Sequence, residues 1–347
     1  MKFNLICVAL LFSLLLSCKK DNSNNNVKNE TISLGSNYAN EIYYSLGKGP
    51  VAIVPRNNWD IAFNTNIFSP TIITNGGEGV LLYEYKKGAD STVWNTAIDT
   101  TGLSAKPVLY NSDTTWAFGA FERNMPGHPD YGWGTYNEII HDIIGKTLFV
   151  IKLASNTYKK ILIVRKYSTL NKFNIRYANI DGSDVQNVSI DCSTYTKKNF
   201  VYYSLSTNTI LADREPDSDQ WDFLITKYIQ MIPAGPGVTM PYPVVGILAN
   251  TVMLNTMGVI SYTGVRSAKL GNTDPVTTDY SQANFTTDIS TIGYDWKTYD
   301  NGTNQYTVLN NVVNFIQKPD QSIYKIVFTA YNGSTTGNIG FTTIKLK

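Results

Sequence analysis

Two histidines and a methionine stand in one short stretch of the chain and are the side chains best suited to bind a metal ion. They are Met125, His128 and His141, and the chain contains no other histidine. Imidazole nitrogen and thioether sulfur are common ligands of transition metals in proteins. The spacing of 13 residues between the histidines allows both to reach one metal across a loop, but does not require it.

Each histidine also has a plain structural interpretation. His128 stands between Gly127 and Pro129, which suits a turn. His141 follows two isoleucines and precedes Asp142, which suits a histidine hydrogen-bonded at the edge of a core. The segment is rich in glycine, proline and aromatic residues, which predicts an exposed loop with apolar faces.

Signatures of common enzyme mechanisms are absent from the sequence. It contains no Gly-x-Ser-x-Gly motif, no His-Glu-x-x-His pair and no phosphate-binding loop. Cys192 has no obvious activating partner, and among 27 acidic residues some carboxylate pairs occur by chance. We therefore expect a binding protein and no enzyme activity.

The charge pattern points away from nucleic acid. The formal net charge is +2 and there is no basic run. One acidic cluster could bind Ca²⁺, but it lacks the turn glycine of a known loop motif, so a solvated linker is the preferred interpretation. The cluster comprises Asp213, Glu215, Asp217, Asp219 and Asp222.

The N-terminus has the pattern of an exported bacterial lipoprotein. A short basic start and an apolar run from Leu5 to Leu16 predict a signal peptide over residues 1–17. Leucine and a small residue before Cys18 resemble a lipobox, so we expect Cys18 to be lipidated. The polar residues that follow predict a flexible tether, and residues 18–34 are assigned to the lipidated cysteine and this tether. Cys192 then has no partner for an internal disulfide.

Short alternating runs separated by turn residues indicate an all-β, β-rich fold with few short helices. The runs cover residues 147–153, 161–164, 201–205, 323–330 and 340–346. Asn-Gly, Asp-Gly and Gly-Gly pairs punctuate them, as expected for antiparallel strands joined by tight turns. Residues 136–144 are compatible with one or two helical turns.

A weak internal repeat predicts two related antiparallel β halves, sandwich-like in architecture. Trp59-Asp60 recurs as Trp221-Asp222, and a Tyr-Lys hairpin near Tyr158 recurs near Tyr324. The order is preserved and the spacings are similar. We therefore divide the chain into a first half, residues 35–190, with a loop insert, and a second half, residues 191–347. Both aspartates of the Trp-Asp pairs are expected to tie down backbone amides.

Several segments of the sequence resemble those of the HmuY-like haem-binding lipoproteins of Bacteroidota, in an extended form. The resemblance begins at Trp59–Asn64 with the following Asn75-Gly76-Gly77. It includes Tyr242–Asn250 and the end of the chain from Tyr324. The family implies an all-β fold, no enzyme activity, capture of haem through two axial side chains, and transfer of haem to a TonB-dependent outer-membrane receptor.

The resemblance turns the histidine-containing stretch into a predicted haem site near residues 120–145. His128 and His141 are the first candidates for the iron, with Met125 as a third, and Arg123 or Lys146 could meet a propionate. Known members use histidines, and others use methionines, so four further methionines stay open. They are Met231, Met240, Met253 and Met257. The side chains expected to stack on the porphyrin are Tyr131, Trp133 and Tyr136.

The same reasoning places the protein on the outer membrane, held by its lipid and displayed at the cell surface, with the periplasmic face as the alternative. The competing function is a surface adhesion or glycan-binding β lipoprotein without haem, because a fold does not dictate its site. A purely structural or interaction role is the third possibility.

Overall fold

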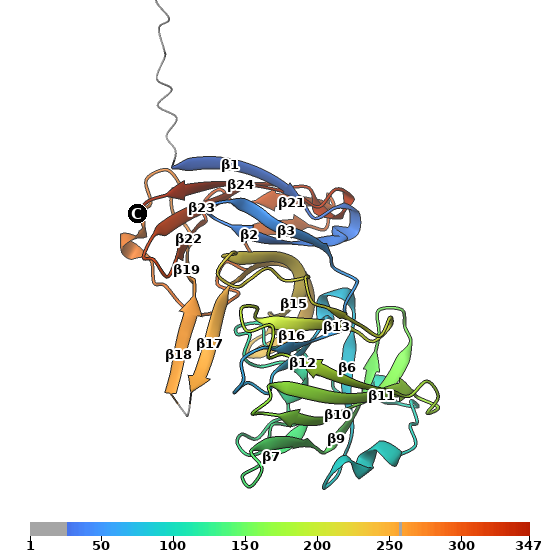
Figure 1. Cartoon of the computed structure of the whole chain (residues 1–347). Coiled ribbons are helices and arrows are strands. Elements are labelled where there is room, and N and C mark those ends of the chain that lie inside the picture. Colours follow the sequence, from blue (N-terminus) through green and yellow to red (C-terminus); the bar gives the residue numbers. More distant parts are fainter. Residues whose placement is uncertain (1–25, 257–258) are drawn as a thin grey trace, which may run out of the picture.

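The computed structural model of the chain describes residues 26–256 and 259–347 (Figure 1). The predicted signal peptide, Cys18 and the candidate Met257 lie outside these residues. The described part is all-β, as predicted, and its helical segments are short 3-10 turns. They are η1 (Ser36–Tyr38), η2 (Gly76–Glu78), η3 (Ser91–Asn95), η4 (Leu103–Ala105), η5 (Ala120–Glu122), η6 (Tyr280–Gln282) and η7 (Gly333–Thr335).

One pair of sheets is built from the middle of the chain and is called the first unit. Its smaller sheet has the order β14 (Thr209–Leu211), β13 (Phe200–Ser204), β4 (Ile61–Asn64), β5 (Ile72–Thr74). Its larger sheet contains β12 (Gln186–Asp191), β11 (Lys172–Asn179), β10 (Tyr158–Tyr167), β9 (Thr147–Lys152), β6 (Leu81–Lys87), β8 (Asp142–Gly145) and β7 (Gly134–Asn137). The apolar faces of the two sheets meet in one core that includes Phe63, Phe149, Phe173 and Tyr203.

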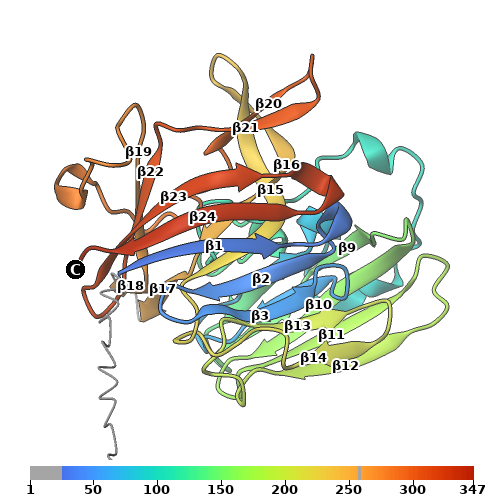
Figure 2. The ribbon, with the colours of Figure 1, turned by 90° about the horizontal axis from the view of Figure 1, so that it is seen from above.

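The other pair of sheets, called the second unit, combines both ends of the chain. Its smaller sheet has the order β16 (Val238–Ala249), β15 (Phe223–Gly235), β2 (Asn40–Ser45), β3 (Gly49–Pro55). Its larger sheet has the order β1 (Val27–Ser33), β24 (Asn338–Lys345), β23 (Ile323–Tyr331), β22 (Val313–Gln317), β19 (Arg266–Leu270). In Figures 1 and 2 the N-terminal strands β1–β3 accordingly lie beside β23, β24 and β15.

The two units share one strand order. The pairing β12-β11-β10-β9-β6 in the first unit corresponds to β1-β24-β23-β22-β19 in the second, and β14-β13-β4-β5 corresponds to β3-β2-β15-β16. Trp59 and Trp221 precede equivalent strands, β4 and β15. Each indole packs edge-on against a tyrosine of the neighbouring hairpin, Tyr202 at 4.9 Å and Tyr43 at 5.0 Å between ring centroids.

The Asn-Gly-Gly motif after β5 has a counterpart after β16. Asn75 donates its amide to the carbonyl oxygens of Arg56 and Trp59, at 2.8 and 2.9 Å. Asn250 donates in the same way to Ser218 and Trp221, at 2.7 and 2.8 Å. Gly77 is needed because η2 packs against β15: a Cβ at this position would lie 1.8 Å from the carbonyl oxygen of Lys227.

Two segments differ from the sequence expectation. Residues 27–33, placed in the flexible tether, form edge strand β1, whose backbone pairs with β24 although its side chains are mostly exposed. Residues 136–144, where helical turns were considered, form the β7–β8 hairpin. The sheets also cross the expected division at residue 190, since β2 and β3 pair with the second unit. Backbone pairing between strands does not require an apolar pattern. A polar edge strand such as β1 therefore cannot be recognised from its sequence.

Two hairpins extend from the second unit. One is formed by β17 (Thr251–Thr256) and β18 (Val259–Gly264), the other by β20 (Lys297–Asp300) and β21 (Gln305–Val308). In Figure 1 the β17–β18 hairpin projects beside the first unit, and this arrangement forms the walls of the cavities described next.

Candidate functional site

The histidine-containing loop between β6 and β9 is held by buried polar anchors. Glu122, in η5, accepts hydrogen bonds from the backbone amides of Ile72 and Gly119, both at 2.9 Å. Burial raises the pKa of this carboxyl well above its usual value. Lys146 forms a 2.6 Å ion pair with Asp130. Glu122 therefore ties the loop to β5, and Asp130 is held to the residue that precedes β9.

Three predicted site residues line one cavity, which we call the loop cavity. They are Met125, His128 and Tyr131, and the cavity has a volume of about 240 Å³. A fourth wall comes from the second unit, because Met253 of β17 faces the same space. The apolar rim is completed by Phe68 and Phe118, whose side chains are exposed.

The two histidines do not share this cavity. Tyr136 contacts both rings, with centroid distances of 5.3 Å to His128 and 6.2 Å to His141. His141 sits in the β7–β8 turn, where its Nδ1 lies 2.9 Å from the Tyr136 hydroxyl. His128 instead lies 3.4 Å, Nδ1 to oxygen, from the hydroxyl of Tyr131. Joint coordination of one iron by His128 and His141 is thus not the arrangement in this structure.

Trp133 is placed in the core, and this corrects the expectation that it stacks on a ligand. Its side chain is fully buried and its indole donates to the carbonyl oxygen of Pro70 at 3.1 Å. It packs near Phe173, with a centroid distance of 6.3 Å. Tyr131 and Tyr136 are half-buried and remain at the surface of the loop.

The remaining sequence candidates fall away from the loop cavity or into structural roles. Lys146 is paired with Asp130, and Arg123 is exposed. Met240 is exposed on β16. Cys192 is a buried free thiol, and burial raises its pKa to about 12, which makes it a poor nucleophile.

The acidic residues near 213–222 do not form a metal site in the described part of the chain. Glu215 is buried and accepts the backbone amides of Asn199 and Phe200, at 2.7 and 3.2 Å. Asp222 accepts the backbone amide of Leu46 at 2.7 Å. Buried carboxylates of this cluster therefore join backbone segments.

A second opening, which we call the amide cleft, adjoins the loop cavity and has a volume of about 480 Å³. Side chains of successive residues on a strand point to opposite faces, so β17 separates the two spaces: Val252 and Leu254 face the amide cleft and Met253 the loop cavity. Its polar lining combines serine and threonine hydroxyls and Lys198 with four amide side chains, those of Asn64, Asn66, Asn171 and Asn199. The Oδ1 atom of Asn171 is buried without a hydrogen-bond partner.

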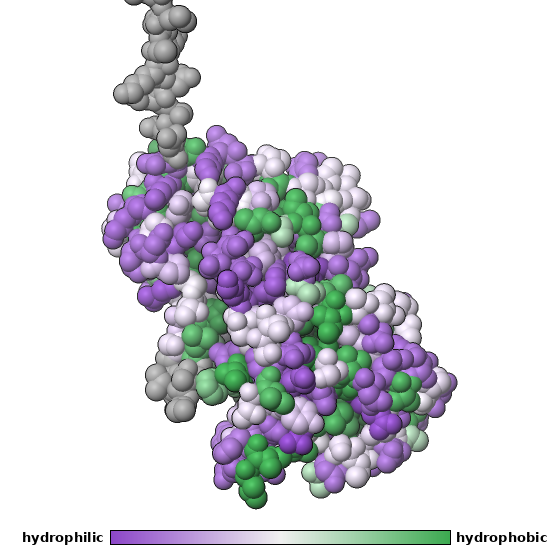
Figure 3. Space-filling view, viewed as in Figure 1, coloured by the Kyte–Doolittle hydropathy of each residue, from purple (hydrophilic) through white to green (hydrophobic). Residues whose placement is uncertain are grey.

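Exposed apolar side chains mark the first-unit end of the molecule. Ile139 and Ile140, in the β7–β8 turn, are 88% and 44% exposed. In Figure 3 apolar atoms gather at this end, where Figure 1 places β7. None of the described helical segments has the length and apolar character needed to cross a bilayer.

Comparison with known proteins gives only distant likenesses. No protein-family profile matches the chain, and no curated protein matches it either. Among solved structures, apo PinO from Porphyromonas gingivitis matches over 92% of this chain and 97% of its own, with 10% identity and a TM-score of 0.25. A candidate lipoprotein from Bacteroides fragilis matches over 54% of this chain and 88% of its own, with 14% identity and a TM-score of 0.19.

Proposed function

We propose that this chain is a HmuY-like haem-binding lipoprotein, a binding protein without catalytic activity. The observation that carries the proposal is the convergence of His128, Met125 and Met253 on the loop cavity. Imidazole and thioether are the axial ligands that haem iron most often takes in proteins that carry or transfer electrons or haem. Aromatic rings at the rim supply the apolar contact that a porphyrin needs.

The proposed ligand set combines the two units of the fold. His128 comes from the loop of the first unit and Met253 from β17 of the second, while Met125 lies beside His128. A side chain from each unit can approach the two faces of a planar macrocycle. The cavity of about 240 Å³ is below the usual range of about 300–1,000 Å³ for enclosed ligand sites. Part of the porphyrin would therefore stay outside it, which suits a protein that passes its haem on.

Titration of the chain that follows Cys18 with haemin tests this function. A sharpened and shifted Soret band that saturates at one haem per chain is the expected result. A low-spin spectrum in the reduced state would indicate axial ligation from both faces. Haemin that keeps the spectrum of free haemin in the presence of excess protein would reject haem binding for this chain.

The location belongs to the same proposal: a lipid on Cys18 holds the protein on the outer membrane, at the cell surface, where a TonB-dependent receptor takes over the haem. Replacing Cys18 with serine should release the protein from the membrane fraction. Protease accessibility on intact cells distinguishes the outer face from the periplasmic face. Unchanged membrane fractionation of the Cys18→Ser variant would contradict the lipid anchor.

A second candidate function is glycan binding, and the amide cleft favours it. Amide and hydroxyl side chains line the cleft together, and both are suited to the hydroxyl groups of a sugar. Binding to a panel of oligosaccharides in the absence of haem is the measurement. Saturable binding to a glycan together with failure of the haemin titration would make this the function.

A further inference from the structure

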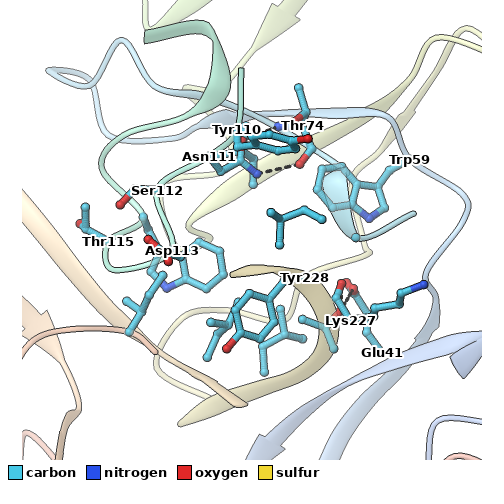
Figure 4. A pocket seen from close by; sticks show the side chains of 18 of the residues that line it. Glu41, Trp59, Thr74, Tyr110, Asn111, Ser112, Asp113, Thr115, Lys227 and Tyr228 are labelled. Atoms are coloured by element: carbon cyan, nitrogen blue, oxygen red, sulfur yellow. Dashed lines mark hydrogen bonds between the residues drawn. The ribbon is translucent and has the colours of Figure 1, made fainter. Parts of the chain in front are cut away.

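A third cavity lies between the two units and is separate from the proposed haem site. This inter-unit cavity has a volume of about 70 Å³. A water molecule needs about 10–15 Å³ on this measure, so the space accommodates about five water-sized groups. Its walls are aromatic on several sides, and Figure 4 shows the rings of Trp59, Tyr110 and Tyr228 around it. Trp116 and Tyr202 complete the aromatic lining.

Contacts with one another and with the surrounding fold hold most of the rings that line the cavity. Trp59 packs edge-on against Tyr202. Trp116 donates its indole N–H to the carbonyl oxygen of Ala249 at 3.0 Å. The Tyr228 hydroxyl donates to Gln230 at 3.1 Å. The cavity is therefore a preformed space and its lining rings are already held in place.

The unbalanced charge at this cavity is negative. Asp113 lies at its edge and accepts the backbone amide of Met231 at 2.9 Å and the side-chain amide of Gln230 through Oδ2. Among the described residues no cationic side chain forms an ion pair with Asp113. Asp288 is close enough for the Asp113 charge to raise its pKa further, beyond the larger effect of burial.

The charged groups on the other side of the cavity are directed elsewhere. Glu41 is neutralised by its ion pair with Arg214. Figure 4 shows the Lys227 chain running away from the middle of the cavity, and its ammonium lies within the influence of Arg56 and Glu78. A cation that enters between the rings meets Asp113 without a competing protein cation.

We propose that the inter-unit cavity binds a small organic cation of the quaternary or alkyl ammonium class. Aromatic rings attract such cations through their π faces, and the methyl groups of the cation gain apolar contact. Asp113 supplies the counter-charge. A trimethylammonium group has the size of the cavity, whereas a bare metal ion would need several oxygen ligands, and no group of three acidic or histidine side chains stands together in the described chain.

The test compares choline with 3,3-dimethylbutan-1-ol, which has the same shape but a carbon in place of the charged nitrogen. The full mature chain is titrated by calorimetry at constant ionic strength, with sodium chloride replacing choline chloride in the control. Choline should bind about tenfold more tightly than the neutral alcohol, the size expected for a desolvated cation–π site. Equal binding of the two, or no binding of choline at millimolar concentration, would overturn the proposal.

Two variants locate the binding. Asp113→Asn keeps an acceptor for Met231 and removes the charge, so it should weaken choline binding about tenfold and leave the alcohol unchanged. Tyr110→Leu should weaken binding of both compounds. Asp99→Asn makes the same charge change on an exposed residue that also lies between β6 and β7, and it should change neither. Choline binding unaffected by both Asp113→Asn and Tyr110→Leu would place the cation elsewhere and reject this site.

Discussion

The phenol oxygens of Tyr43 and Tyr202 lie 3.1 Å apart, in a hydrogen bond that joins the two units. Tyr43 is on β2 and Tyr202 on β13, strands that hold equivalent places in the two smaller sheets. Both side chains are buried, and burial raises the pKa of both phenols well above the usual value. Equivalent residues of a repeated unit therefore meet at their own interface as a neutral pair away from water.

Removing one hydroxyl of this pair is expected to destabilise the fold. Tyr202→Phe leaves the buried Tyr43 phenol without its partner, which costs about 1–3 kcal/mol. Tyr43→Phe removes the same hydrogen bond from the other side and leaves the buried Tyr202 phenol without it. The double variant should cost less than the sum of the two, since no unpaired phenol remains at the Tyr43 position. Denaturant unfolding measures all three changes, and strictly additive costs would mean that the bond contributes nothing.

Asp60 and Asp222 are predicted to act on stability and not on ligand binding. Asp60 accepts the backbone amide of Leu205 at 2.7 Å, as Asp222 accepts that of Leu46. Alanine at either position should lower the free energy of unfolding by about 1–3 kcal/mol, because a buried amide loses its acceptor. Asp60→Asn retains an acceptor oxygen and serves as the matched control. A loss of haem binding in a folded Asp60→Ala protein would argue against this assignment.

The two histidines should behave differently in haem titrations. His128→Ala should abolish the low-spin spectrum, because this imidazole lines the loop cavity. His141→Ala should leave it intact, since that ring is bonded to Tyr136 outside the cavity. Met253→Leu keeps the volume of the side chain but removes the sulfur, and it tests the second ligand. Binding through imidazole should also weaken in acid, as protons compete with iron. Unchanged haem binding in the double variant His128→Ala, His141→Ala would exclude histidine ligation.

The lowered pKa of Lys166 predicts that the free energy of unfolding rises with pH. Its side chain is buried, donates to the carbonyl oxygens of Asn66 and Ser69, and burial lowers its pKa from 10.5 to about 7. Between these two values the unfolded state binds more protons than the folded state, so the free energy of unfolding increases as pH rises. Lys166→Met should flatten this dependence, measured by urea unfolding at both ends of the window.

A second lysine with a lowered pKa tests whether the effect of Lys166 on haem binding is specific to its position. Lys297, on β20 of the second unit, is half-buried, has its pKa lowered to about 7 by desolvation, and does not line the loop cavity. Lys297→Met should flatten the pH dependence to a similar degree. Only Lys166→Met should also weaken haem binding, because it releases the segment that carries Phe68 at the cavity rim. Equal haem affinity in both variants would show that this anchor does not shape the site.

Local sequence patterns were sufficient to predict the strands and a repeated unit marked by the Trp-Asp pairs. They did not predict how the terminal strands pair. Alternation and turn residues act over a few positions, so the β9–β10 and β22–β23 hairpins could be read directly. β2 and β3 form a local hairpin, but the other partner of β2 is β15 and the partner of β1 is β24, both far along the chain. No local signal specifies these distant partners. Register Ser33 to Asn338 is decided by the tertiary fold.

Only the part of the candidate site that comes from the first unit was predictable from the sequence. Met125, His128 and Tyr131 are close in sequence, and their loop keeps them together. Sequence could not tell which aromatic of that loop is buried, and Trp133 is the one that fills the core. Nothing in the sequence around Met253 distinguishes it from the other methionines. Its place in the loop cavity follows from the position of β17 beside the first unit.

The completion of the second unit by β1–β3 has a consequence for the order in which the chain can fold during synthesis. The strands that leave the ribosome first find their neighbours, β15 and β24, only after most or all of the chain has been made. The loop that must close between β1 and β24 is nearly the whole protein, and contacts of such separation form slowly. A chain built this way cannot complete its second unit until its C-terminal strands have left the ribosome.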